Sequence, residues 1–181
     1  MLLKEKHLPR YTIRDYERWQ GDWELVEGIP YALASPSLTH QRVVVLLSML
    51  LELQLEEKEE CKDCVLTIDT DYVVSEDTVF RPDLAIVCSN KDEKITKTPK
   101  LIIEVVSPAS RKMDEEIKPI YYSKEGVKYY LLVYPQERKM VLKLLTEEGR
   151  YKDLNLDKEF TFKFKEGCEL KLNPAEVWRR L

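Results

Sequence analysis

The sequence predicts a mixed α/β (α+β) fold in which one sheet, with strands of both directions, is flanked by helices. Apolar residues recur at helical spacing through the long segment 38–58. The run LIIEVV at 101–106 is almost wholly apolar, which is typical of a strand covered on both faces. Helical and strand-like segments follow one another along the chain, and this order favours a sheet with helices packed on it.

A short helix and a hairpin are the first predicted elements. A helical stretch over 13–19 follows Pro9, and the segment WELVEGIPYAL then predicts two short strands joined at Glu27-Gly28, a turn dipeptide that allows positive φ. Ser37 is a suitable N-cap for the long helix after it. The apolar face of that helix is formed by five residues: Val43, Leu46, Leu47, Leu50 and Leu53.

The remaining elements complete a sheet with a second helix. Three strands are predicted over 65–74, 79–88 and 101–106. A helix then runs from the capping residue Ser110 to about Lys124, and Gly126 supplies its C′ stop. Two further strands, a weak tail strand and a terminal helix are predicted over 127–134, 139–145, 160–164 and 173–180. The middle of the chain therefore has the order α-β-β-β-α-β.

Length and composition indicate one domain over residues 1–181. The chain of 181 residues fits the roughly 100–200 residues of a typical domain, and no linker or repeat divides it. A hydrophobic fraction of 44% is too high for a disordered chain. No apolar run reaches the ~18 residues of a membrane span, and the charged start MLLKEKHLPR has no signal-peptide core. We expect a soluble, cytoplasmic protein without membrane partners.

The charge balance neither requires nor excludes binding to nucleic acid. The net charge is −4, from 29 basic and 33 acidic residues. A local basic rim around an acidic metal site is compatible with a negative total. Gln and Asn are scarce while Lys and Glu are plentiful, which indicates a thermophilic source.

The four cysteines favour reduced structural thiols. Cys61 and Cys64 form a C-x-x-C motif, whereas Cys88 and Cys168 stand alone. A zinc ribbon needs a second pair of ligands, and a thioredoxin-like motif should open a helix after a strand; neither condition is met. A Cys61–Cys64 disulfide or an adventitious metal is the alternative.

Two carboxylates interrupt apolar strands. Asp83 stands in FRPDLAIV and Glu104 in LIIEVV. A charge within a buried strand is costly unless it is paired or binds a metal. If the two strands are neighbours, about 4.8 Å apart, both carboxylates can reach one cation, and such oxygen ligands suit Mg²⁺ or Mn²⁺. The structural alternative is that Glu104 pairs with a Lys or Arg and Asp83 caps a strand end.

These residues carry a resemblance to a known family. The segments RPDLAIV, PKLIIEVVSPASR and GVKYYLLVYP, with a helical lysine between the last two, resemble the Uma2 family of restriction endonucleases in the PD-(D/E)XK nuclease superfamily. WELVEG and His40 resemble the N-terminal pattern of that family. The resemblance covers about residues 23–134. It implies a restriction-endonuclease-like core with the element order given above, in which Asp83 and Glu104 hold a divalent metal.

The resemblance also implies a displaced lysine. The superfamily places a lysine two residues after the acid, but that position here is Val106, which agrees with the E-x-V variant of Uma2. In this variant the role passes to a helix position that maps to Lys118. Pro119 removes one helical hydrogen bond and can kink the helix, which affects the reach of the lysine. The alternative for Lys118 is an i,i+4 surface pair with Asp114.

Two N-terminal residues are further candidates. Glu24 matches the strand Glu of the family, and we assign it a catalytic role in supporting the metal water or binding a second ion. The alternative is a solvent-facing hairpin residue. His40 lies in the first turn of the long helix, where the positive helix end disfavours a cation. We therefore expect a neutral, hydrogen-bonding supporting residue or, equally, a surface histidine.

Three residues near the second helix complete the candidate site. Tyr122 follows Lys118 by one turn and either supports the site or packs against the sheet. Arg111 and Lys112, beside the strand end that carries Glu104, are candidate phosphate contacts.

The leading hypothesis is a Mg²⁺- or Mn²⁺-dependent endonuclease that hydrolyses phosphodiester bonds in DNA. Asp83, Glu104 and the carbonyl of Val105 would hold the ion, which acidifies its water and offsets charge on the phosphate. Lys118 would orient the water or stabilise the transition state. The alternatives are a catalytically inactive nuclease-fold module that binds nucleic acid or a protein partner, and an RNA-directed or repair-type nuclease with the same site.

A homodimer is the expected assembly. Cutting both strands of a duplex needs two sites, and closed two-fold dimers are the commonest oligomers. The strand over 139–145 and the tail strand are the candidate interface edges.

Overall fold

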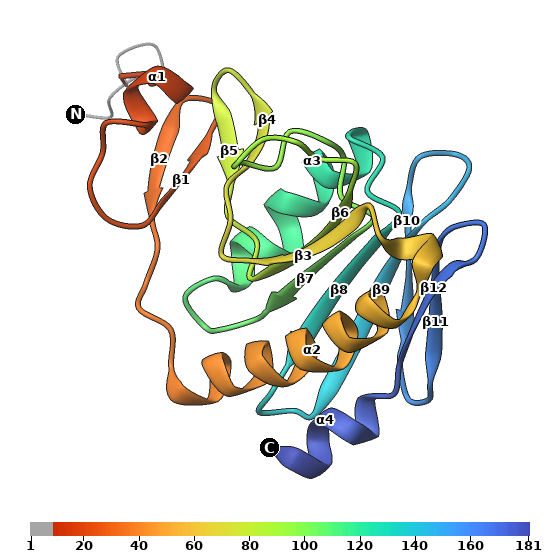
Figure 1. Cartoon of the computed structure of the whole chain (residues 1–181). Coiled ribbons are helices and arrows are strands. Elements are labelled where there is room, and N and C mark those ends of the chain that lie inside the picture. The colour runs from red at the N-terminus through yellow and green to blue at the C-terminus, as the bar shows by residue number, and fades with distance from the viewer. Residues whose placement is uncertain (1–8) are drawn as a thin grey trace.

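A six-stranded sheet lies at the centre of the molecule (Figure 1), in a computed structural model that describes residues 9–181; the charged start over 1–8 lies outside the described residues. The strand order is β10-β9-β8-β7-β6-β3. β7 and β8 are parallel, and the other neighbouring pairs are antiparallel. The strands are β3 (Cys64–Ile68), β6 (Leu84–Cys88), β7 (Leu101–Val105), β8 (Tyr129–Tyr134), β9 (Lys139–Leu145) and β10 (Tyr151–Asn155).

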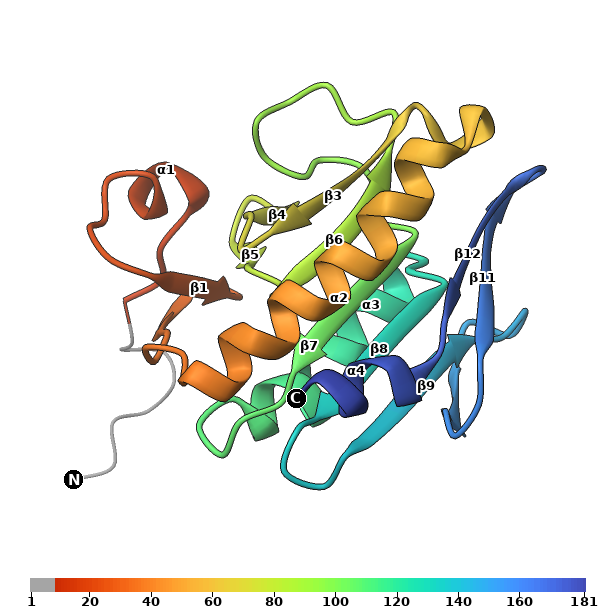
Figure 2. The same cartoon turned by 60° about the horizontal axis from the view of Figure 1, so that its bottom comes forward.

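The two predicted helices cover opposite faces of this sheet (Figure 2). α2 (Leu38–Glu57) begins at Ser37, whose side chain accepts a hydrogen bond from the backbone of His40 as predicted for an N-cap. α2 packs residues such as Leu47 against alternate strand positions, and α3 (Lys118–Lys124) packs Tyr122 against the intervening ones. Apart from β4 and β5, which belong to a second sheet, the chain follows the order α2-β3-β6-β7-α3-β8. This confirms the predicted α-β-β-β-α-β core and the mixed sheet.

A second sheet lies beside the N-terminal segment, with the strand order β2-β1-β5-β4. The predicted hairpin is confirmed as β1 (Trp23–Val26) and β2 (Ile29–Ala32). Gly28 has φ +76°, and a Cβ there would lie 3.0 Å from the Cβ of Arg10, so the turn requires glycine. The predicted helix over 13–19 is shorter, as α1 (Ile13–Tyr16).

Two predicted strands are each divided between the two sheets. The segment 65–74 forms β3 and then β4 (Tyr72–Ser75), because Asp69 adopts φ +52° and turns the chain out of the first sheet. The segment 79–88 forms β5 (Thr78–Phe80) and then β6, because Pro82 has no N–H with which to continue a ladder. The resulting β4–β5 hairpin pairs with β1 and brings the N-terminal hairpin to the core.

The C-terminal region holds a two-stranded sheet and a helix. β11 (Phe160–Lys165) and α4 (Pro174–Arg180) match the predicted tail strand and terminal helix, while β12 (Cys168–Leu172) and the edge strand β10 were not predicted. β9 lies between β8 and β10. The expectation that the strand over 139–145 forms an interface edge is therefore wrong.

All four cysteines are paired, so the prediction of reduced thiols is wrong. Cys61 bonds to Cys168 across a sequence separation of 107 residues, and Cys64 bonds to Cys88. Cys64 and Cys88 lie directly opposite each other on β3 and β6, which sequence spacing alone does not reveal. The two cysteines of the C-x-x-C motif thus belong to two different disulfides. They form neither a Cys61–Cys64 bond nor a metal site.

None of the helices between residues 9 and 181 combines the length and apolar character needed to cross a lipid bilayer.

Candidate active site

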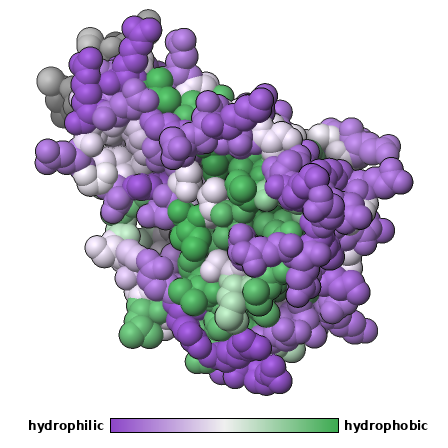
Figure 3. All heavy atoms as spheres, in the orientation of Figure 1, coloured by the Kyte–Doolittle hydropathy of each residue, from purple (hydrophilic) through white to green (hydrophobic). Residues whose placement is uncertain are grey.

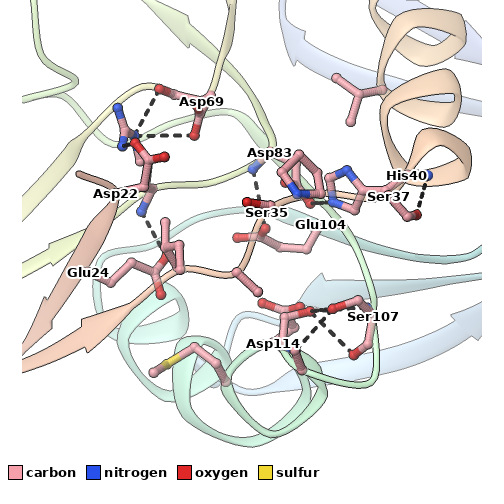
Figure 4. Close-up of a pocket in the computed structure, with 18 of the residues that line it drawn as sticks. Asp22, Glu24, Ser35, Ser37, His40, Asp69, Asp83, Glu104, Ser107 and Asp114 are labelled. Carbon is pink, nitrogen blue, oxygen red and sulfur yellow. Dashed lines mark hydrogen bonds and ion pairs between the residues drawn. The ribbon is translucent and has the colours of Figure 1, made fainter.

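Asp83 and Glu104 come together where β6 begins and β7 ends. The pairing of Leu84 with Ile103 sets Asp83 opposite Glu104, and the Asp83 N–H lies 3.3 Å from Oε2 of Glu104. The Val105 N–H donates to Oδ2 of Asp83 at 2.7 Å. Both carboxylates line one cavity of about 530 Å³ (Figure 4). The prediction that they lie on adjacent strands and face one cavity is confirmed.

Lys118 reaches the same site from the start of α3. Its Nζ lies 2.8 Å from Oε1 of Glu104 and 2.9 Å from Oε1 of Glu24. It also lies 3.1 Å from Oδ1 of Asp114, one turn earlier on the helix. All four residues are at least 97% buried. The predicted pair of Lys118 with Asp114 exists, but it is not a surface pair.

Glu24 belongs to the same buried cluster. It projects from β1, and its Oε1 also accepts a hydrogen bond from the backbone N–H of Arg81 at 2.9 Å. The hairpin therefore carries Glu24 inward, and the alternative of a solvent-facing residue is wrong. The side chains of Glu24, Asp83, Glu104 and Asp114 converge on the cavity from separate segments of the chain (Figure 4).

A π-helical turn over Met113–Ile117 places Asp114 and Lys118 on one side of the helix. In this turn the N–H of Lys118 donates to the carbonyl of Met113, five residues earlier. The next donor would be residue 119, but proline has no N–H. The Tyr130 hydroxyl instead donates to the carbonyl of Asp114 at 2.8 Å. The helix thus continues through Pro119 after the π turn. π turns of this kind often occur at functional sites.

The charges of the cluster do not balance within the chain. Burial raises the pKa of Glu104 well above its usual value, although Lys118 acts in the opposite direction. Burial also acts to lower the pKa of Lys118, but the Glu104, Glu24 and Asp114 carboxylates outweigh it and hold that pKa well above normal. Three buried carboxylates therefore share one ammonium, and the site favours additional positive charge.

His40 contacts the site through Asp83. Its Nε2 lies 3.1 Å from Oδ2 of Asp83, and its side chain is 16% exposed, so it is not a surface histidine. Burial acts to lower the pKa of His40, but the hydrogen bond and the charge of Asp83 raise it overall. The raised pKa favours the protonated form of His40, whereas its position at the start of a helix alone predicts the neutral form. Nδ1 of His40 is buried without a hydrogen-bond partner among the described residues.

The other predicted residues divide between the site and the surface. Tyr122 is buried, packs edge-on against Phe80 and lies with its hydroxyl 3.4 Å from Oε1 of Glu104. Arg111 and Lys112 are exposed and do not line the cavity. Arg111 instead lies 3.3 Å from Glu137.

Two residues at the site were not predicted from the sequence as functional. The sequence predicts Asp114 only as a surface partner of Lys118, because its segment gives no sign of burial. Arg81 lines the cavity and is held by Asp22 at 2.6 Å and by Asp69 at 3.2 Å. Its position directly before the Pro-Asp pair was an available signal.

The donor set fits a hard divalent cation bound by few protein ligands. Within residues 9–181 no three His, Cys, Asp or Glu side chains form a metal-binding cluster. Lys118 stands among the buried carboxylates. Asp83 and Glu104 nevertheless present two carboxylates side by side. The Val105 N–H points to Asp83. In a strand, the N–H and the carbonyl of one residue point to the same side. The carbonyl of Val105 therefore also faces Asp83. Mg²⁺ is often held by one or two carboxylates, with waters as its other ligands.

Comparisons with known proteins agree with this fold. The family model described as "Uma2: Putative restriction endonuclease" matches residues 13–172. A similar solved structure is titled "Crystal structure of a putative nuclease belonging to DUF820 from Anabaena variabilis". It superposes with a TM-score of 0.72 at 12% identity, over 93% of this chain and 98% of that chain. At this identity the likeness shows the fold alone. No curated protein matches the chain.

Proposed function

Since this chain belongs to the Uma2 family, we propose that it is a metal-dependent endonuclease that hydrolyses phosphodiester bonds in DNA. The observation that carries the proposal is the convergence of Glu24, Asp83, Glu104 and Asp114 on one cavity with a single buried ammonium. A bound cation would stabilise the negative charge of these carboxylates. A phosphodiester is also negatively charged, so its approach to the carboxylates requires a cation between them.

Asp83, Glu104 and the carbonyl of Val105 are the proposed ligands of Mg²⁺ or Mn²⁺. Such an ion supplies a water of lowered pKa and offsets negative charge on the scissile phosphate. His40 fixes the orientation of Asp83 through the contact at 3.1 Å, and the Val105 N–H holds the same oxygen. Both contacts use Oδ2, so Oδ1 of Asp83 is the proposed metal-binding oxygen.

Lys118 is the proposed electrostatic catalyst. Its three carboxylate partners fix the ammonium before substrate arrives, and a preorganised donor of this kind stabilises charge that develops in the transition state. Glu24 and Tyr122 act on Lys118 and Glu104 respectively, so their proposed role is to position the site. Arg111 and Lys112, outside the cavity, remain proposed contacts to backbone phosphates. Arg81 is a further candidate at the cavity wall.

Nicking of supercoiled plasmid DNA tests the proposal. The wild type should nick the plasmid only when Mg²⁺ or Mn²⁺ is present, and Asp83→Ala should abolish the activity. Asp157→Ala is the matched control, because Asp157 is exposed and lies away from the cavity. Equal activity of the wild type and Asp83→Ala would contradict the proposal.

The second candidate is a module that binds nucleic acid, or a protein partner, without cleaving it. The observation in its favour is Val106, which stands two residues after Glu104, where the nuclease superfamily has its lysine. Metal-dependent retention of a labelled DNA or RNA duplex, without cleavage of either, would support this candidate. Cleavage of RNA but not of DNA would support the proposed metal-dependent hydrolysis of phosphodiester bonds, with RNA instead of DNA as the substrate.

A further inference from the structure

The outward face of α2 carries a stripe of exposed apolar residues. Val45, Met49 and Leu53 are 50%, 39% and 55% exposed. Arg42 and Glu56, which are also exposed, continue the stripe at its two ends. Apolar surface gathers over α2 and the sheet edge beside it, surrounded by hydrophilic residues (Figure 3). We call these five residues the α2 stripe.

The α2 stripe has the same spacing in both directions from Met49. Val45 and Leu53 lie four residues before and after it, and Arg42 and Glu56 lie seven residues before and after it. Steps of three and four residues keep all five side chains on one side of the helix. In an antiparallel pair of such helices centred on Met49, each residue meets the one at the mirrored position of the other helix.

We propose that a second copy of this chain packs its α2 antiparallel against this stripe, with Met49 on the two-fold axis. Val45 of one protomer then contacts the partner's Leu53, and Met49 contacts the partner's Met49. Arg42 pairs with the partner's Glu56. The two-fold axis repeats every contact, so both ends of the interface carry an attractive ion pair.

The charges around the stripe fit this occupant. Glu52 lies one turn before Glu56, and its Oε2 is buried without a hydrogen-bond partner among the described residues. Burial and the neighbouring Glu56 raise the pKa of Glu52. An antiparallel partner brings its Arg42 to this acidic end of the helix, where it offsets both carboxylates. A parallel partner would instead place Glu56 against Glu56.

The geometry also predicts the strength and shape of the dimer. The stripe spans 15 residues, about 21 Å of helix. One helix pair is small beside the roughly 1,200–2,000 Å² of a stable interface, so we expect association at micromolar concentration. The two His40 residues, each nine residues from the axis, would lie about 27 Å apart along the paired helices.

Charge reversal tests the pairing directly. Sedimentation velocity at several micromolar concentrations should show a dimer of the wild type. Arg42→Glu and Glu56→Arg should each shift it to monomer, because like charges then meet at both ends of the interface. The double variant Arg42→Glu/Glu56→Arg should restore the dimer. Lys152→Glu, an exposed change on β10, is the control and should leave the dimer intact.

Cross-linking tests the register. Met49→Cys should give a covalent dimer with a short bifunctional maleimide, because the two residues meet at the axis. Gln41→Cys should not, since its two copies would lie about 24 Å apart along the helices. A monomer at all these concentrations, a double variant that stays monomeric, or cross-linking through residue 41 rather than 49 would overturn the proposal.

Discussion

The ammonium of Lys118 lies 2.8 Å from Oε1 of Glu104, while the residue two positions after Glu104 along the chain is Val106. The helix supplies the ammonium instead, from a position directly after a π turn and directly before Pro119. The contact therefore depends on helix geometry as well as on residue type, and substitutions can separate its effects on rate, metal binding and folding.

Lys118→Ala should lose on the order of a hundredfold or more in the rate of DNA nicking, the scale of one electrostatic donor. Metal binding should persist, because an ammonium repels a cation rather than holding it. Stability should fall by about 3–5 kcal/mol, since the variant leaves buried carboxylates without their partner. Nicking assays and urea denaturation of the same preparation measure both effects.

Lys124→Ala is the control for this substitution, because Lys124 lies on the same helix but is exposed. Adding Val106→Lys to Lys118→Ala should restore part of the rate, since Val106 lies in the same cluster as Tyr122, on the Glu104 face of β7. Nicking by Lys118→Ala at the wild-type rate would show that the lysine has no catalytic part.

Mg²⁺ or Mn²⁺ should raise the melting temperature of the wild type. A ligand at a hundred times its Kd adds about 2.7 kcal/mol, which corresponds to roughly 5–10 °C for a chain of this size. In Glu104→Gln the metal-induced shift should vanish, because one of two proposed carboxylate ligands is lost. Glu137→Gln, an exposed substitution, should keep it. A shift that survives in Glu104→Gln would place the ion elsewhere.

Tyr130→Phe should destabilise the protein by about 1–3 kcal/mol, because the buried carbonyl of Asp114 loses its donor. The loss should be smaller in a Pro119→Ala background, where the new backbone N–H can donate to that carbonyl. A double-mutant cycle by urea denaturation measures this coupling. Tyr134→Phe, whose hydroxyl contacts the side chain of Glu115, is the control and should show no coupling to residue 119.

Loss of the two disulfides should have unequal effects on stability. By loop-closure entropy, the Cys61–Cys168 bond contributes about 4.8 kcal/mol and the Cys64–Cys88 bond about 3.4 kcal/mol. Replacing Cys61 and Cys168 by Ser should therefore lower the melting temperature more than replacing Cys64 and Cys88. The reverse order would show that loop length does not decide the effect.

Most of the core was predictable because hydrophobic periodicity reports burial directly. α2 and β7 have the clearest patterns, and both were predicted to within a residue or two. The divided strands were not predictable in this way, since β3 and β4 form one alternating run and only the left-handed φ of Asp69 separates them. β10 is a half-exposed, polar edge strand whose pairing with β9 defines it more than its own sequence does.

The candidate site was predictable where charge interrupted an apolar run, as at Asp83 and Glu104. Asp114 lies in the polar run MDEEI, so nothing local distinguishes it from its exposed neighbours. Its burial follows from the π turn and from the approach of β1, which carries Glu24. The disulfides depend in the same way on pairing between distant segments, and spacing along the chain does not contain that information.

The Cys61–Cys168 bond also makes most of the chain a closed covalent loop. A protease that cuts any single peptide bond between these two cysteines opens the loop without separating the pieces. The exposed turns at 91–93 and 147–150 both lie inside it. A nicked molecule would therefore keep β12 attached to the turn at Cys61 that follows α2. Its cleavage would appear on a denaturing gel only after a reducing agent is added.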